Sequence, residues 1–298
     1  MVNLRKEFIN KVYFKYIRDG KSPLLQYTDK LLNYSEKKRL DVKHAVAQKY
    51  PNIIKADVEI VAMALTSQCN LRCEGCSYGR GFMPKEHLSL DIVKETLDSM
   101  KEMGIPYISL YGGDPTMIGS SDLVEIVSYA TKLGIYSNLG TNGILLTPKL
   151  MDKLYEAGLR RVFIGVYGIG EEYDKYVKQK GAFDKLEQNI AYIREKYPDV
   201  AVNLGWLLMK PTCNLQSTEA ITQFIQKHSI DIYITLVHYD FPYFNNGEDE
   251  ELQLFEEDLP QIKEVIEEFI RLKKAYPQII TNSLTALNSI PDWLIKKG

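Results

Sequence analysis

The sequence predicts an α/β fold in which helices cover a parallel β-sheet. From about residue 58 onward, short segments that read as strands alternate with longer segments of helical period, six times in all. Residues that stop helices, such as Gly104 and Gly158, stand between these segments. The chain has 298 residues, of which 45% are hydrophobic, so it can bury a core of barrel size.

Two helical segments are expected before this alternation begins. Apolar residues recur at about the helical period over residues 4–16, and Gly20 and Pro23 break the pattern. A second helical stretch runs from about residue 27 to residue 50 and stops before Pro51.

The alternating elements can be placed in order along the chain. Strands are expected at 58–65, 107–111, 135–139, 161–166, 200–209 and 230–237. Helices are expected at about 89–103, 122–133, 147–158, 183–197, 218–228 and 259–276. Thr147 as N-cap and Pro148 at the first helical position mark the start of the third of these helices.

Six alternations leave two ways to close the sheet. It can be an open doubly wound sheet or a partial barrel. In both, the loops that follow the carboxyl ends of the strands form the functional site.

Charge and hydropathy exclude some function classes. The formal net charge is −2, so bulk charge does not point to nucleic acid, and no apolar run reaches the length of a membrane span. Residues 1–50 hold twelve Lys and Arg against five Asp and Glu, whereas residues 248–251 are all acidic. Such charge runs usually form solvated faces or loops. The alternative is that the basic segment 1–50 binds an acidic partner, such as a peptide leader or anionic lipid. No secretory signal is visible, so a cytoplasmic protein is expected.

Three cysteines after the first strand form the most specific motif. Cys69, Cys73 and Cys76 are spaced C-x3-C-x2-C, with no fourth cysteine nearby. Three thiolates can hold three irons of a cubane cluster and leave the fourth iron open, whereas electron-transfer clusters normally take four protein ligands. The alternatives are zinc with a histidine as fourth ligand, and a structural disulfide. His87, eleven residues past Cys76, does not match common zinc spacings, and a cytosolic thiol cluster more often binds metal than forms a disulfide.

Two glycine-containing turns follow the second and third strands. The second strand ends in Tyr111-Gly112-Gly113-Asp114-Pro115, where paired glycines let the backbone come close to a ligand. The third strand leads to Gly140-Thr141-Asn142-Gly143, which is either an ordinary turn or part of the site.

With the cysteine spacing, these turns and the stretch from Gly165 to Ile190, the sequence resembles the radical S-adenosylmethionine (radical SAM) superfamily. It resembles the peptide- and protein-modifying (SPASM-type) branch in particular, but lacks the auxiliary-cluster cysteines. The resemblance covers about residues 57–240 and implies a partial (βα)6 TIM-like barrel there. Residues 1–56 are then a helical N-terminal extension, and residues 241–298 an acidic loop and a C-terminal helix.

The resemblance also implies which residues meet the cofactors. Cys69, Cys73 and Cys76 would hold a [4Fe-4S] cluster whose open iron chelates SAM. The positions that would meet SAM are Gly75, Tyr78, Gly112, Gly113, Asp114, Thr141, Asn142, Gly165 and Lys178.

The chain departs from the family pattern at several of these positions. Asp114 replaces a Glu, and Gly75 replaces an aromatic residue that packs on adenine, so Tyr78 is the candidate for a stacking ring. Gly165, Tyr167, Tyr173 and Val177 stand where the family has Ser, Asp, His and Arg. Lys178 can replace the Arg as a point charge on the SAM carboxylate, or can be a solvated lysine.

The implied chemistry is reductive cleavage of SAM to a 5′-deoxyadenosyl radical, which abstracts hydrogen from a substrate. The expected substrate is a ribosomal peptide; the alternatives are a small molecule, or a non-catalytic iron or zinc protein with a regulatory role. An external one-electron reductant such as flavodoxin or ferredoxin is the implied partner. Cys213, after the fifth strand, is either a hydrogen-atom donor or a packed apolar residue. His238, Tyr239 and Asp240 are candidate substrate contacts by position alone.

Overall fold

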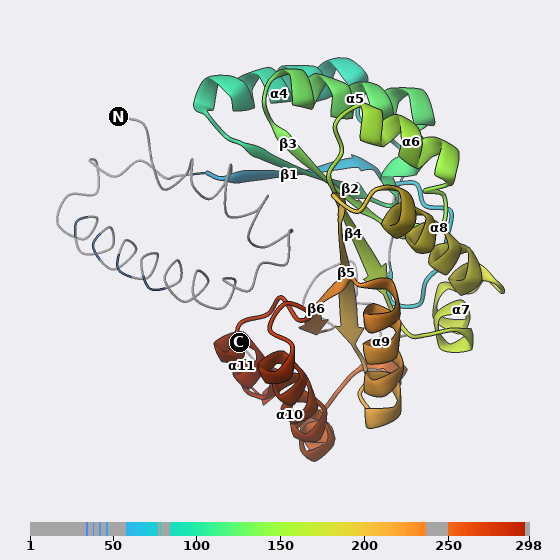
Figure 1. Cartoon of the computed structure of the whole chain (residues 1–298), viewed down its shortest axis with the longest axis vertical. Coiled ribbons are helices and arrows are strands. Elements are labelled where there is room, and N and C mark those ends of the chain that lie inside the picture. Colours follow the sequence, from blue (N-terminus) through green and yellow to red (C-terminus); the bar gives the residue numbers. More distant parts are fainter. Residues whose placement is uncertain are drawn as a thin grey trace. The chain divides into compact units, whose positions relative to one another are not determined.

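Figure 1 shows the computed structural model of the chain. It describes residues 58–76, 78, 84–236 and 250–295, and Tyr34, Lys38, Val42 and Val46. The chain divides into two units, Met1–Glu59 and Ile60–Gly298, and the four isolated residues in the first unit are helical. The helix predicted at 4–16, most of that at 27–50, the acidic run at 248–249 and the candidates 238–240 lie outside the described residues. The domain limits at 56 and 240 stay predictions.

The second unit is built on one six-stranded parallel sheet, with the strands in the order β1-β2-β3-β4-β5-β6. The strands are β1 Ile60–Thr66, β2 Tyr107–Gly112, β3 Tyr136–Thr141, β4 Arg161–Val166, β5 Ala201–Leu208 and β6 Asp231–Leu236. Each strand pairs with the next one along the chain, whereas a doubly wound sheet reverses its order at a switch point. The predicted α/β class and the partial barrel are confirmed.

Helices connect the strands, and α4, α5, α6 and α8 lie along one side of the sheet (Figure 1). The helices are α4 Leu90–Met103, α5 Ser120–Lys132, α6 Pro148–Glu156, α7 Glu171–Val177, α8 Ala182–Lys196, α9 Leu215–His228, α10 Leu259–Ala275 and α11 Leu284–Ile295. Short 3-10 turns are η2 Pro115–Ile118, η3 Glu250–Leu252 and η4 Glu256–Asp258. In the described parts of the chain, none of the helices has the length and apolar character needed to cross a membrane.

The predicted helix ends are borne out where a specific residue marks them. The side chain of Thr147 accepts a hydrogen bond from the Leu150 amide, and Gly104 adopts the left-handed conformation at φ 69° after α4. Helix α9 begins three residues earlier than predicted, because Asn214 caps it by accepting from the Ser217 amide at 2.8 Å. Helices α7 and α11 were not predicted.

The two faces of the sheet differ in burial. On the face toward the helices, Leu110, Leu139 and Val162 are fully buried and stand side by side in register. On the opposite face, Tyr111 and Tyr233 keep 42% and 45% of their surface exposed. The second face is therefore only partly covered, as the interior of a partial barrel is.

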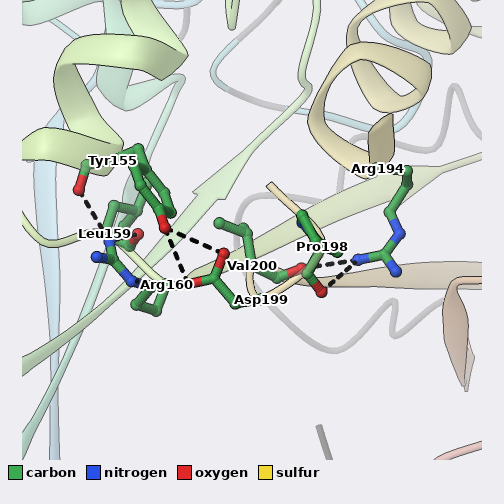
Figure 2. Close-up of polar contacts among 7 residues, drawn as sticks. All are labelled: Tyr155, Leu159, Arg160, Arg194, Pro198, Asp199 and Val200. Carbon is green, nitrogen blue, oxygen red and sulfur yellow. Dashed lines mark hydrogen bonds and ion pairs between the residues drawn. The ribbon is translucent and has the colours of Figure 1, made fainter. Parts of the chain in front are cut away.

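Polar side chains fix the turns that lead into β4 and β5. Figure 2 shows these contacts among Tyr155, Leu159, Arg160, Arg194, Pro198, Asp199 and Val200. The Arg160 guanidinium donates to two carbonyls at 2.8 Å and lies 3.2 Å from the Asp199 carboxylate, while Arg194 donates to the carbonyl of Val200 at 3.0 Å. These contacts lie at the amino ends of the strands, the end of a barrel that serves stability.

Candidate functional site

The cysteine loop leaves the carboxyl end of β1 and is held by helix α7. Cys73 is buried, Cys69 and Cys76 are half-buried, and all three are free thiols. The amide of Glu74 donates to the carbonyl of Tyr176 at 2.9 Å, and the amide of Arg72 donates to the carbonyl of Val177 at 3.4 Å. The last carbonyls of α7 therefore fix the backbone of the loop, and this short helix is the main element that sequence reasoning missed.

Burial makes the free thiols hard to ionise. It raises the pKa of Cys69 to about 11 and that of Cys73 further still, and the neighbouring thiols add to both shifts. The charge of Lys178 acts in the opposite direction on the pKa of Cys73. A bound cation reverses this balance, because metal binding takes the thiolate form and releases protons.

The donor set consists of three free thiols on one short loop. In the portion of the chain that the structure covers, no three His, Cys, Asp or Glu side chains form a group that could hold one metal ion. The thiols of Cys69 and Cys73 both interact electrostatically with that of Cys76, and in a cubane each of the three thiolates would bind a different iron. The imidazole of His87 lies 3.4 Å from the side-chain nitrogen of Gln68, so the residue considered as a fourth zinc ligand contacts the loop through an amide instead.

The paired glycines bring the end of β2 against the cysteine loop. The amide of Gly113 donates to the carbonyl of Thr66 at 2.7 Å, and the amide of Asp114 donates to the carbonyl of Gln68 at 2.8 Å. A Cβ atom at Gly112 or Gly113 would lie 2.2 Å from one of these carbonyl oxygens. The paired glycines were predicted to let the backbone approach a ligand. In the structure they let the end of β2 approach the cysteine loop.

Asp114 is fully buried, and its carboxylate ties two loops together. One oxygen accepts from the amide and hydroxyl of Thr116, and the other accepts from the Thr141 hydroxyl and the Asn142 amide, both at 2.8 Å. Four donors already meet the carboxylate, so this side chain positions the Thr141-Asn142 turn. The side chain of Asp114, although shorter than the Glu it replaces, is long enough to accept from Thr116, Thr141 and Asn142.

Asn142 connects the turn after β3 to the first cysteine. Its side-chain nitrogen lies 2.8 Å from the Asn70 carboxamide oxygen and 3.8 Å from the sulfur of Cys69, which also accepts from the amide of Leu71 at 3.4 Å. The segment is the expected turn, with Gly143 at φ 78°, and it also contacts the cysteine loop. Nothing in the sequence indicated that Asn70, two residues before Arg72, would contact this turn.

The remaining predicted SAM positions surround the same loop. Gly75 is buried with φ 72°, Tyr78 is half-buried, and Lys178 is exposed with φ 56° just after α7. Gly165 lies under Tyr167, because a Cβ atom at Gly165 would lie 2.5 Å from the Tyr167 hydroxyl oxygen. The hydroxyl of Tyr167 therefore occupies the space that a side chain at position 165 would fill.

A group of tyrosines packs behind the loop. The ring of Tyr167 stacks on Tyr176 with centroids 4.4 Å apart and faces Tyr173 at 6.2 Å. Tyr173 is fully buried, and in the described structure its hydroxyl has no hydrogen-bond partner. Burial raises the pKa of Tyr173, and electrostatic interactions with Cys73, Asp114 and Cys69 add to the shift.

Cys213 lies after β5, as predicted, but its thiol is not on an accessible surface. The residue is fully buried, and its amide donates to the carbonyl of Met209 at 2.8 Å. Burial raises the pKa of Cys213 to about 12, and the charged neighbour is Asp258, just before α10. This environment favours a packing role over hydrogen-atom donation.

Comparison with known proteins gives the family. A family model described as the Radical SAM superfamily matches residues 63–224, more than half of the chain. An AdoMet-dependent heme synthase of Methanosarcina barkeri is 33% identical over 138 residues, which are 46% of this chain and 39% of the relative. The mycofactocin maturase MftC of Mycolicibacterium smegmatis is 34% identical over 120 residues, which are 40% of this chain and 30% of the relative.

Solved structures share the fold. Streptococcus suis SuiB bound to precursor peptide SuiA superposes with a TM-score of 0.63 at 13% identity, covering 85% of this chain and 55% of that one. Native anSMEcpe with bound AdoMet gives a TM-score of 0.59 at 16% identity, covering 72% of this chain and 62% of that one.

The curated relatives are matched over less than half of their length. The match to the family itself spans the cysteine loop, the glycine pair after β2 and the Asn142 turn. The chain therefore belongs to the radical SAM superfamily, whose cofactors are a [4Fe-4S] cluster and S-adenosylmethionine.

Proposed function

We infer that the chain starts a radical reaction on a peptide substrate. The observation that carries the proposal is the loop of three cysteines, spaced C-x3-C-x2-C at the carboxyl end of β1, in a chain of this family. A peptide is favoured by relatives named as a mycofactocin maturase and a PqqA peptide cyclase, and by the likeness to SuiB, whose structure holds a precursor peptide. The basic composition of residues 1–50 adds to this, because it suits an acidic leader segment.

In this proposal Cys69, Cys73 and Cys76 hold the cluster. When bound, the cluster and SAM supply a 5′-deoxyadenosyl radical that abstracts a hydrogen atom from the substrate. The protein keeps the thiolates in place through α7 and the Asn142 side chain. A one-electron reductant such as a flavodoxin or ferredoxin is the proposed partner.

The SAM contacts are assigned to the residues around the loop. Gly75 and the end of β2 at Gly112 and Gly113 are the proposed backbone contacts, and Gly112 and Gly113 lie directly against the cysteine loop at Thr66 and Gln68. Lys178 offers a positive charge near Cys73. The hydroxyl of Tyr167 fills the space beside Gly165 and is a further candidate donor for the SAM carboxylate.

The partly covered face of the sheet is the proposed substrate surface. Tyr111 and Tyr233 are exposed there, whereas the Phe163 ring covers the backbone at Gly205, the residue paired with Tyr233. Exposed tyrosines provide apolar area together with a polar hydroxyl, which suits side chains of a bound peptide.

A second candidate is a small-molecule reaction on a tetrapyrrole. Relatives named AdoMet-dependent heme synthase and Fe-coproporphyrin III synthase match at 33% and 31% identity, which favours it. A non-catalytic zinc or iron protein is the third.

The test is anaerobic reconstitution followed by a comparison of substrates. The proposal predicts about four irons per chain, and 5′-deoxyadenosine release that rises when a precursor peptide encoded nearby is added. A rise with an iron porphyrin, but not with peptides, would establish the second candidate. One zinc per chain without 5′-deoxyadenosine would establish the third. Cys73→Ala is the disabled variant, and Cys213→Ala is its matched cysteine control.

A further inference from the structure

We propose that the hydroxyl of Tyr173 donates a hydrogen bond to the sulfur of the bound cluster and thereby raises its reduction potential. The inference rests on the proposed function, because it needs the cluster in place. It makes Tyr173 a positioning residue that acts on the cofactor rather than on the substrate.

The first observation is a buried donor without an acceptor. Tyr173 has no exposed surface, and no described atom accepts from its hydroxyl. Buried polar groups are nearly always paired, so an unpaired one calls for an explanation, such as a redox role or a bound group. A phenol keeps its proton at neutral pH and can donate it.

The second observation is that the ring is fixed. The edge of the ring meets Phe183 with centroids 5.7 Å apart, and its face lies along Tyr167 at 6.2 Å. With aromatic rings on two sides, the hydroxyl cannot swing to another acceptor without opening the core.

The third observation is where this fixed hydroxyl lies. The helix that carries Tyr173 also holds the cysteine loop, through the carbonyls of Tyr176 and Val177. Besides burial, the groups that act electrostatically on the hydroxyl are Cys73, Asp114, Cys69 and Asp174, in decreasing order of effect.

Asp114 is not the missing acceptor, because four other donors already meet its carboxylate. The carboxylate of Asp174 already accepts from the amides of Gly181 and Phe183. Among the groups that act on the hydroxyl, the cysteine sulfurs and the cluster that they would hold remain as acceptors.

A hydrogen-bond donor at this place should raise the reduction potential of the cluster. Reduction adds a negative charge to the cluster, and a hydrogen bond to sulfur stabilises the more negative state. Loss of the donor should therefore make reduction harder. Asn142, which lies 3.8 Å from the sulfur of Cys69, is a second donor of the same kind.

The test is a redox titration of the reconstituted protein without SAM, followed by electron paramagnetic resonance. Tyr173→Phe should keep its iron and shift the reduction equilibrium about tenfold, which is about 59 mV toward negative potential for one electron. Tyr173→His restores a donor and should recover part of the shift. The control is Tyr192→Phe, whose hydroxyl donates to Asp152 at 2.6 Å on another helix.

The outcomes separate the possibilities. An unchanged potential in Tyr173→Phe overturns the inference, and so does a shift that appears only after SAM is added, because the hydroxyl then serves SAM. If Tyr173→Phe folds but loses its iron, recovery by Tyr173→His supports the inference and no recovery overturns it. Failure of the wild type to bind about four irons would instead overturn the proposed function.

Discussion

The carboxylate of Asp114 should be the strongest single tie within the site. In Asp114→Asn one oxygen remains, but an NH2 group replaces the oxygen that accepts from Thr141 and Asn142 at 2.8 Å. Those two donors then face another donor. Two lost hydrogen bonds to a charged group, at about 1.5 kcal/mol each, lower the free energy of unfolding by about 3 kcal/mol.

The assay is thermal or urea unfolding of the metal-free protein, followed by circular dichroism. For a unit of this size, a loss of about 3 kcal/mol lowers the Tm by roughly 6–12 °C. Asp122→Asn, an exposed aspartate in the first turn of α5, is the control and should cost less than about 1 kcal/mol. If the free energy of unfolding of Asp114→Asn lies within about 1 kcal/mol of the wild-type value, the carboxylate does not stabilise the site as its hydrogen bonds indicate.

Three further predictions follow from single positions. Gly113→Ala should prevent cluster binding, since its Cβ would lie 2.2 Å from the carbonyl oxygen of Gln68; an iron assay after reconstitution checks this, and normal loading would contradict it. Hydrogen bonds from Tyr192, Tyr197 and Lys196 lower the pKa of Asp152 from 3.8 to about 2. Its contribution to stability should be complete above pH 3.8 and lost as pH falls through about 2, and Asp152→Asn should remove this dependence from acid unfolding curves. Cys213→Ala should lower the melting temperature and leave both SAM cleavage and product formation unchanged; product loss with intact SAM cleavage would restore the hydrogen-donor role.

The sequence predicted the sheet well because its signals are local. Strand periodicity and helix caps such as Thr147 and Gly104 act within a few residues. The alternation left an open doubly wound sheet and a partial barrel possible, and the resemblance to the radical SAM superfamily favoured the partial barrel, whose strand order the structure has. Helix α7 was not predicted because it has only seven residues. Tyr173, Tyr176 and Val177 nevertheless have the spacing of a buried helical face. The same helix then proved to hold the cysteine loop.

The site was predictable in its motifs but not in its internal contacts. The spacing of the cysteines and the paired glycines marked two loops that the structure brings into contact. That Asp114 serves Thr141 and Asn142, and that Tyr167 fills the space beside Gly165, depends on contacts between residues far apart in the sequence. Periodicity and spacing carry no information about such pairs. The burial of Cys213 depends in the same way on the packing around β5.

In the proposed reaction, three cysteines hold the cluster and leave one iron free to bind SAM. The most direct measurement is Mössbauer and electron-nuclear double resonance spectroscopy of the anaerobically reconstituted protein, with SAM labelled in its amino and carboxylate groups. We expect one iron of four to change its signature on SAM addition and to couple to the labelled atoms. Four equivalent irons whose spectra do not change when SAM is added would contradict this proposal. So would a single metal ion bound by Cys69, Cys73 and Cys76.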